Sequence, residues 1–182
     1  LNGLHAAQAH RAGSALIFGA GPIGLLMAIG LQVSGLTNIS LVDLDRWRLS
    51  MAESFGFKAI EAHSEALNSL RQNVDLVADA AGAPAVATKL IDYIANGGVG
   101  LFFGVCPSEA RIEISPFELF RRQITLAGSH SLNHNIPEAI EGLKAYGTDI
   151  GRLVSHRLSL AEINQVFEGY GPKESLKIQF CR

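Results

Sequence analysis

The stretch "FGAGPIG", Phe18–Gly24, is the most informative part of this sequence, because it places a Gly-x-Gly-x-x-Gly motif between two apolar runs. The run before it, Ala15–Phe18, reads as a buried strand, and the run that begins at Pro22 reads as a helix. Such a motif arises by chance in glycine-rich sequences. A strand before it and a helix after it are the setting in which it holds the pyrophosphate of a dinucleotide, and we expect such a site here.

Each glycine of the motif has a separate physical role. Gly19 permits a sharp turn from strand to helix, Gly21 lets the backbone approach a pyrophosphate, and Gly24 lets the helix pack closely on the strand. Pro22 removes one N–H donor, but proline is favoured in the first turn of a helix, where φ is already near its fixed value. The amide of Ile23 is therefore the donor that we expect to face the pyrophosphate, at the positive end of the helix.

An acidic residue at the right spacing supports this interpretation. Asp43 ends the next apolar run, 19 positions after Gly24. A carboxylate at this spacing accepts the hydroxyls of an adenosine ribose and repels a 2′-phosphate, so NAD is favoured over NADP. The alternative, a tight turn whose glycines serve packing alone, leaves Asp43 unexplained. Arg48 follows closely and either lies along the adenosine or belongs to a solvated helix face.

Apolar and amphipathic runs alternate along the first two thirds of the chain. Four apolar runs predict buried strands over Ala15–Phe18, Ile39–Asp43, Asp75–Ala80 and Val99–Gly104. Helices are predicted over Pro22–Gly35, Arg46–Gly56, Ser64–Asn73 and Ala83–Gly97, three of them ending at a glycine. Strands that are apolar on both faces favour a parallel sheet with helices on each side. The predicted fold class is therefore α/β, a Rossmann-type doubly wound sheet.

The last third of the chain changes character. The run Ala110–Ser115 alternates and reads as an edge or interface strand, and capping signals at Ser115–Glu118 predict a helix start. Further elements are expected as a strand over Ile124–Ser129, a helix from Asn135 through Tyr146, a helix capped by Ser159 and Glu162 that runs to about Tyr170, and a strand over Ser175–Phe180. The chain shows no obvious linker, so one domain over residues 1–182 is predicted, with short terminal elements.

The composition excludes several classes of function. The 182 residues carry a formal net charge of −2 and are 48% hydrophobic, which suggests no general attraction to nucleic acid or to an anionic membrane. Cys106 and Cys181 match neither a metal-ligand spacing nor a disulfide framework, which fits a reducing cytosol. The chain begins without methionine, inside a segment that resembles the middle of a helix, which indicates a piece of a longer protein.

Other chemistries have weaker support. The six histidines form no pair with a carboxylate or cysteine at ligand spacing, and His130 and His134, four apart, lie in a segment that does not look helical, so no metal ligands are predicted. A hydrolase would need a Gly-x-Ser-x-Gly elbow, which the sequence lacks. A methyltransferase that binds S-adenosylmethionine uses similar strand, loop and acid logic, but the third glycine at Gly24 favours the longer pyrophosphate ligand.

The joint order of several segments resembles one known family. These segments are "GSALIFGAGPIGLLMAIGLQVSG", "LVDLDRWRLSMAESFGF", "DLVADAAGAPAVATKLIDYIANGGVGLFFGV", "SHRLSLAEINQVFEGY" and "LKIQF". Together they are similar to the coenzyme-binding, C-terminal half of medium-chain zinc-type alcohol dehydrogenases, closest to the sorbitol and other polyol dehydrogenases. The resemblance implies NAD-dependent oxidation of a secondary alcohol or polyol by the full-length parent.

The resemblance also implies what this chain lacks. In that family the catalytic zinc ligands and the proton relay come from a GroES-like catalytic domain, built mainly by the N-terminal half. The sequence is therefore expected to hold no catalytic residue and no zinc ligand, with zinc bound only in the full-length parent. Residues from about 150 to 182 are expected to belong to that catalytic domain or to pack on it. The alternative is a stand-alone dinucleotide-binding or sensing module without catalysis.

Several site positions follow from the resemblance, residue by residue. Gly19, Gly21, Ile23 and Gly24 match the phosphate loop, Asp43 the ribose ligand, and Arg48 a basic residue beside it. Ala80, Ala81 and Gly82 are expected under the cofactor, with Phe103, Val105, Ser129 and Ser131 at the nicotinamide carboxamide. The run "GSHSLNH" departs from the apolar or aromatic residue that often follows this glycine. The resemblance also implies a homo-oligomer in which the strand Arg111–Ser115 pairs with its copy across a two-fold axis.

Overall fold

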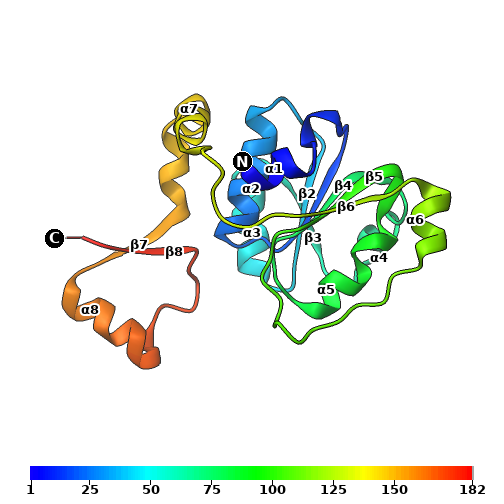
Figure 1. The fold of residues 1–182 in the computed structure, drawn as a ribbon. Helices are drawn as coiled ribbons and strands as arrows, with labels where there is room; N and C mark the ends of the chain where they lie inside the picture. The colour runs from blue at the N-terminus through cyan, green and yellow to red at the C-terminus, as the bar shows by residue number, and fades with distance from the viewer. Residues whose placement is uncertain (182) are drawn as a thin grey trace.

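The computed structural model describes residues 1–181 and contains a six-stranded parallel sheet (Figure 1). The strand order is β3-β2-β1-β4-β5-β6. The strands are β1 (Ala15–Phe18), β2 (Ile39–Asp43), β3 (Lys58–Glu61), β4 (Val74–Asp79), β5 (Ile94–Phe102) and β6 (Thr125–Gly128). The order reverses between β1 and β4, which is the topology of a doubly wound Rossmann fold, so the predicted fold class is confirmed.

Helices cover both faces of this sheet and continue beyond it. They are α1 (Asn2–Ala6), α2 (Pro22–Val33), α3 (Arg46–Ser54), α4 (Glu65–Asn68), α5 (Pro84–Lys89), α6 (Pro116–Arg122), α7 (Ile136–Tyr146) and α8 (Leu160–Gln165). Short 3-10 segments lie at η1 (Ala9–Arg11), η2 (Leu90–Asp92) and η3 (Thr148–Leu153), and a π segment, η4 (Val166–Tyr170), follows α8. None of the helices in residues 1–181 is long and apolar enough to cross a membrane.

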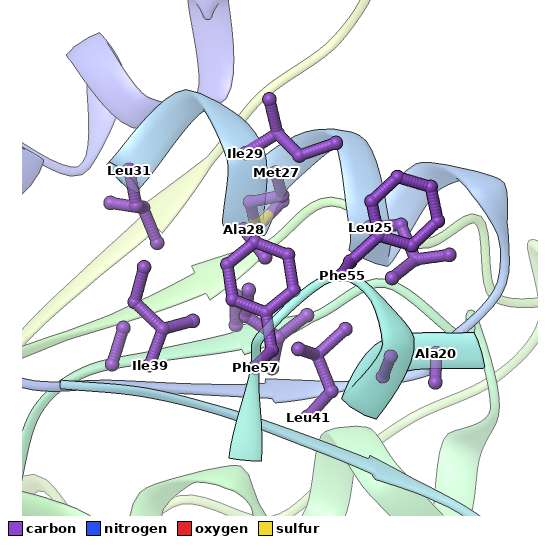
Figure 2. Packing of buried hydrophobic residues seen from close by; sticks show 14 of the residues in the cluster. Ala20, Leu25, Met27, Ala28, Ile29, Leu31, Ile39, Leu41, Phe55 and Phe57 are labelled. Atoms are coloured by element: carbon purple, nitrogen blue, oxygen red, sulfur yellow. The ribbon is translucent and has the colours of Figure 1, made fainter. Parts of the chain in front are cut away.

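The core has two layers because side chains alternate across the strands. In β1, Ala15 and Ile17 join one apolar cluster, whereas Leu16 and Phe18 join the other. Figure 2 shows part of the first cluster, where α2 lies over the sheet with Phe55 and Phe57 filling the space between them. All four residues of β1 are buried, as the continuous apolar run predicts for a central parallel strand.

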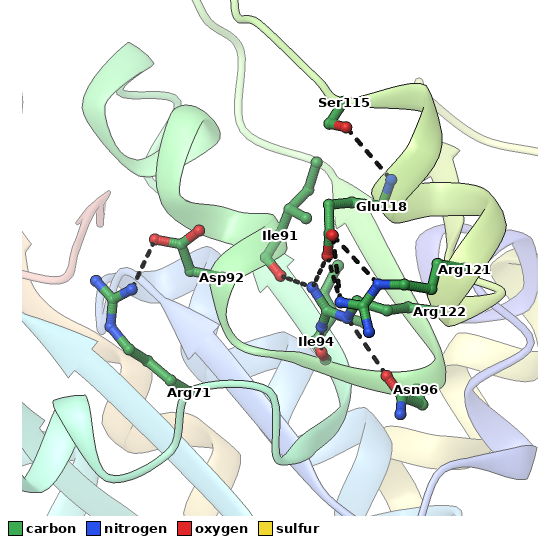
Figure 3. A network of polar contacts seen from close by, with 9 residues as sticks. All are labelled: Arg71, Ile91, Asp92, Ile94, Asn96, Ser115, Glu118, Arg121 and Arg122. Atoms are coloured by element: carbon green, nitrogen blue, oxygen red, sulfur yellow. Dashed lines mark hydrogen bonds and ion pairs between the residues drawn. The ribbon is translucent and has the colours of Figure 1, made fainter.

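A buried arginine ties α6 to the start of β5 (Figure 3). Arg122 is 3% exposed, and its guanidinium donates to the carbonyl of Ile94 and to Asn96 Oδ1, the latter at 3.4 Å. Its Nη1 lies 3.8 Å from Glu118 Oε2. The hydrogen bond from the Arg121 side chain lowers the pKa of Glu118. The polar contacts of Arg122 go to β5, to the segment η2 just before it and to α6 itself. This network therefore fixes α6 against the sheet.

The C-terminal residues form a smaller unit beside the sheet, orange to red in Figure 1. Strand β7 (Val154–Leu158) pairs in parallel with β8 (Lys177–Phe180), and α8 connects the two. Two leucines at the edge of this unit, Leu153 and Leu176, are buried in the first apolar cluster. The unit is thus joined to the main core at its edge rather than along a face.

Within the chain, the structure does not form the strand predicted over Ala110–Ser115. Residues 110–115 form no strand, and none of the described residues 1–181 pairs with Arg111–Ser115 in a ladder. Alternation in the sequence signals a segment suited to a sheet, but a strand exists only where a neighbour supplies backbone hydrogen bonds. The helix start beside it is confirmed, since Ser115 Oγ accepts from the Glu118 amide at 3.3 Å.

Two predicted helices are shorter than their sequence pattern. The run Ala83–Gly97 forms only α5 and η2, and β5 already begins at Ile94. Ile94 pairs with Val74, and Gly97 adopts a φ of +76° inside the strand, so this glycine does not end a helix. The predicted helix over Ser64–Asn73 is helical only over Glu65–Asn68. Strands β3 and β7 lack a strong apolar run and were not predicted.

Candidate functional site

The candidate site lies at the carboxyl ends of the parallel strands, where β1 and β4 are neighbours and the strand order reverses. Open parallel sheets hold ligands at this position, because loops on the two sides of the reversal turn away from each other and leave a crevice. Loops that follow β1 and β4 and the end of β2 surround a cleft of about 310 Å³. It is lined by Phe18, Gly19, Gly21, Pro22, Ile23, Val42, Asp43, Leu44, Arg48, Ala62, Ala80, Ala81, Ala83 and Val86.

The glycine loop has the backbone geometry that its sequence predicts. Gly19 has a φ of +108°, which L side chains rarely adopt, and its amide donates to the Val42 carbonyl at 2.7 Å. A Cβ on Gly24 would collide with the Gly19 carbonyl oxygen, so only glycine permits this approach of helix to strand. A Cβ on Gly21 would lie 3.8 Å from Arg48 Nη1, which places this guanidinium beside the loop.

Helix α2 begins at the cleft with its amides available. Gly21 is the N-cap residue and Pro22 is the first helical residue. No side chain among residues 1–181 makes a capping hydrogen bond to this helix start. Ile23 follows Pro22, is 47% exposed and lines the cleft. The N-terminus of this 12-residue helix therefore offers partial positive charge and unpaired N–H groups to an anion.

Asp43 lies at the end of β2 with its carboxylate held beside the glycine loop. Its Oδ2 accepts from the Ala20 amide at 2.8 Å, and its Oδ1 accepts from the Asp45 amide at 3.0 Å. Arg48 Nη1 lies 3.9 Å from Asp43 Oδ2. The Asp43 side chain remains 12% exposed, and a carboxylate has about four lone-pair sites. Acceptor capacity is therefore left for ligand hydroxyls.

The predicted site residues divide into two groups in space. The loop glycines Gly19 and Gly21 line the cleft together with Pro22, Ile23, Asp43, Arg48, Ala80 and Ala81. Gly24 lies behind this surface, where it packs on Gly19. Gly82, Phe103, Val105, Ser129 and Ser131 do not line this cleft. They follow β4, β5 and β6 and extend the same edge of the sheet away from Asp43.

Three residues of the second group, Phe103, Ser129 and Ser131, contact the N-terminal helix α1. The Asn2 side chain donates to Ser129 Oγ at 3.3 Å and to the Ser131 carbonyl at 3.3 Å. A Cβ on Gly3 would lie 2.7 Å from the Phe103 ring, so α1 packs directly on that ring. Val105 is 90% exposed. Asn2 and Gly3 were not among the predicted site residues, because no motif at the chain start signals a contact with loops 100 or more residues away.

Sequence reasoning also missed residues within the cleft wall and beneath it. Leu44 is 74% exposed and Val86 is half-buried, and both are apolar residues that line the cleft. Asp79 is fully buried under the loop Ala80–Gly82. Its only signal in the sequence is an acidic residue that follows the apolar run Leu76–Ala78 at the end of a strand.

The chemistry of the cleft suits binding better than bond breaking. Its lining offers backbone amides, one carboxylate, one guanidinium and apolar walls. The lining contains no histidine, cysteine, serine or lysine that could act as nucleophile or base beside Asp43. Residues 1–181 contain no group of three or more metal-ligating side chains.

Comparisons with known proteins agree with this geometry. The family described as "Glucose dehydrogenase C-terminus" matches residues 3–177. The chain is 44% identical over 186 residues to D-altritol 5-dehydrogenase of Agrobacterium fabrum, covering 100% of this chain and 55% of the relative. It is 25% identical over 178 residues to D-arabinitol dehydrogenase 1 of Uromyces fabae, covering 90% and 50%. The chain thus spans about half the length of these relatives.

Solved structures match over the same share. Alcohol dehydrogenase TADH from Thermus sp. ATN1 superposes with a TM-score of 0.84 at 29% identity, covering 100% of this chain and 55% of that one. L-idonate 5-dehydrogenase from Escherichia coli superposes with a TM-score of 0.84 at 18% identity, covering 100% of this chain and 53% of that one. At this identity the likeness concerns the fold alone. The resemblance to the coenzyme-binding half of zinc-type alcohol and polyol dehydrogenases is therefore confirmed, and the chain belongs to the family described as "Glucose dehydrogenase C-terminus".

Proposed function

We propose that this chain is the NAD-binding part of a zinc-dependent alcohol or polyol dehydrogenase. The observation that carries the proposal is the Asp43 carboxylate, held by the Ala20 amide at 2.8 Å beside the start of α2. A phosphate-binding helix start and a ribose-binding carboxylate then occupy one cleft. Without Asp43 the glycine loop could serve packing alone.

The cleft residues divide the cofactor between them. The amide of Ile23 and the helix dipole of α2 hold the pyrophosphate, and Gly21 lets the backbone approach it. Asp43 accepts the ribose hydroxyls, and Arg48 lies along the adenosine. Leu44 and Val86 provide apolar walls for the adenine. Asp43 also repels a 2′-phosphate, which favours NAD over NADP.

The remaining predicted residues orient the nicotinamide end. Ala80, Ala81 and Gly82 form the floor under the cofactor, and backbone groups of Phe103, Val105, Ser129 and Ser131 meet the carboxamide. When bound, NAD supplies a hydride acceptor at its nicotinamide ring. The cleft contains no paired acid and base, so this chain alone binds the cofactor and has no turnover. The alternative is a stand-alone binding or sensing module, which the lack of a paired acid and base in the cleft also fits.

The substrate class rests on relatives. Both polyol dehydrogenases named above take their names from polyols, and we assign this chain's parent a small polyol or secondary alcohol. Zinc in that parent is bound by residues outside this sequence. The C-terminal unit from about residue 150 packs on the catalytic domain in this proposal. Its support is apolar exposure, with Phe167 86% and Tyr170 78% exposed.

An assembly of two copies completes the proposal. Residues 111–115 lie unpaired, and Phe117 and Phe120 on the adjoining α6 are 64% and 80% exposed. We assign this segment to a ladder with its copy across a two-fold axis, in the cytosol. Sedimentation at high concentration tests the assembly, and a strict monomer would contradict it.

Calorimetry with NAD, NADP and S-adenosylmethionine tests the proposal. NAD should bind most tightly, and Asp43→Ala should weaken NAD about 10- to 100-fold, because hydrogen bonds to a charged group are lost. NADP should be affected less, because its 2′-phosphate is no longer repelled. Glu61→Ala is the matched control, since Glu61 is the residue paired with Asp43 in the neighbouring strand β3. Unchanged NAD affinity in Asp43→Ala would show the assignment to be wrong.

A further inference from the structure

Asp79 is a buried acid at the centre of the proposed site. It is the last residue of β4 and 0% exposed. Its Oδ1 accepts hydrogen bonds from the amides of Ala81 at 2.8 Å and Gly82 at 2.9 Å. Its Oδ2 has no hydrogen-bond partner among residues 1–181. Burying a carboxylate with an unpartnered oxygen costs folding free energy, so stability alone does not account for an acid here.

The main chain of Asp79 holds a second loop of the site. Its carbonyl accepts from the amides of Phe103 at 3.1 Å and Gly104 at 2.7 Å. These two residues follow β5, whereas Ala81 and Gly82 follow β4. One residue therefore orients two loops, through its carboxylate on one side and through its carbonyl on the other.

The turn closed by the carboxylate packs directly on both neighbouring loops. A Cβ on Gly19 would lie 3.1 Å from the Ala80 carbonyl carbon and 3.2 Å from the Ala81 nitrogen. A Cβ on Gly82, whose φ is +68°, would lie 2.7 Å from the Val105 oxygen. Backbone thus meets backbone on both sides of this turn. A shift of the turn has to move the glycine loop or the Val105 loop.

We infer that Asp79 is a positioning residue for the dinucleotide site. Its Oδ1 fixes the turn Ala80–Gly82. This turn then sets the distance between the Gly19 loop and the Val105 loop. Hydrogen bonds to a carboxylate are short and strong, so they can keep the turn in its binding geometry when no ligand is bound. This inference rests on the proposed function, and it adds a residue that itself does not line the cleft.

Three substitutions at Asp79 separate positioning from other roles. Asp79→Ala removes both acceptors and should weaken NAD binding at least about tenfold in calorimetry, at a temperature where circular dichroism shows the chain folded. Asp79→Asn keeps one carbonyl oxygen for the two amides and should bind within about twofold of wild type. Asp79→Leu retains the approximate shape while removing the acceptors, so it replaces Asp79→Ala if the smaller side chain prevents folding.

The matched control is at the opposite end of the same strand. Asp75 Oδ2 accepts from the Gly13 amide at 2.9 Å and from Ser14 Oγ at 2.9 Å. Asp75→Ala removes a comparable pair of hydrogen bonds far from the glycine loop and should leave NAD affinity unchanged. Wild-type affinity in Asp79→Ala, or an equal loss in Asp79→Asn, would overturn the positioning role.

A ligand-free measurement separates this inference from the proposed function. Amide hydrogen exchange of Asp79→Ala should become faster at Ala81 and Gly82 and also at Gly19 and Gly104, whose amides donate to the carbonyls of Val42 and Asp79, because the turn holds both loops. Faster exchange confined to Ala81 and Gly82 would overturn positioning, whether or not NAD binds. A wild-type chain that does not bind NAD would instead overturn the proposed function, and the exchange result would still decide the role of Asp79.

Discussion

The main sheet and the β7–β8 pair are both made of parallel strands, yet they bury very different surfaces. Every residue of β1 is buried, whereas β7 contains no fully buried residue and α8 none either, within the described chain. Two strands alone bury too little apolar surface to be stable in water. The contrast shows that backbone pairing alone does not determine how much apolar surface a strand buries, which depends on the layers that cover the strand.

A few contacts attach the smaller unit to the larger one. Arg152 Nη1 donates to the Ser54 carbonyl at 3.1 Å, and its guanidinium lies 4.4 Å from the centre of the Phe55 ring. Leu153 and Leu176 reach the main core. We therefore expect the C-terminal unit to open at lower free energy than the sheet, as regions with few buried contacts do.

The largest expected difference comes from truncating one large apolar side chain in each of the two regions. Leu16→Ala should lower the free energy of unfolding by about 2–5 kcal/mol, because Leu16 is fully buried and a cavity remains. Phe167→Ala, at an 86% exposed side chain, should change it by less than about 0.5 kcal/mol. Urea unfolding followed by fluorescence and circular dichroism measures both. Similar losses would refute the contrast.

Two arginines give the next comparison. Arg122→Ala should cost about 1–3 kcal/mol, because it leaves the Ile94 carbonyl without its buried donor. Arg152→Ala should cost no more than about 1 kcal/mol, since its side chain is 39% exposed and its contacts are solvated. Thermal unfolding of both variants tests this order, and a larger loss for Arg152→Ala would reverse it.

Substituting two glycines by alanine, one in the site and one outside it, should change stability in opposite directions. Gly24→Ala should destabilise by about 1–3 kcal/mol and abolish tight NAD binding, because its Cβ collides with the Gly19 carbonyl. Gly142→Ala, inside α7 with nothing within 4 Å of the new Cβ, should stabilise by about 0.5–1 kcal/mol. Melting curves with and without NAD separate the two effects. Equal tolerance at Gly24 would show that the loop has no need of glycine there.

The smallest effect concerns the cap of α8. Ser159→Ala should weaken this helix by about 1 kcal/mol, because Ser159 Oγ accepts from the Glu162 amide. The hydrogen bond from the Ser159 hydroxyl, followed by that from its amide, lowers the pKa of Glu162. This stabilisation is present above the ordinary glutamate pKa of 4.5 and is lost as pH falls through the lower folded-state pKa. Amide exchange over Leu160–Gln165 reports it, and protection that does not fall as Glu162 becomes protonated would contradict the coupling.

Much of the larger region could be predicted because its signals are local. Continuous apolar runs identified β1, β2 and β4, and the glycine pattern placed the turn before α2. The capping serines Ser115 and Ser159 marked their helices correctly for the same reason: a cap is a contact between residues three apart. The first half of the site, from Gly19 to Asp43, follows from such short-range rules.

Tertiary contacts decided the rest. The helical pattern before Gly97 yields to β5 because Ile94 pairs with Val74 and Arg122 holds the Ile94 carbonyl. The alternating run at 110–115 joins no ladder within the chain, because no neighbour among the described residues supplies one. Asp79 gains a role only where two loops meet above it. Local sequence thus determined which segments are strand, turn or helix start, whereas long-range backbone hydrogen bonds and burial determined where those elements end and what lies beneath the cleft.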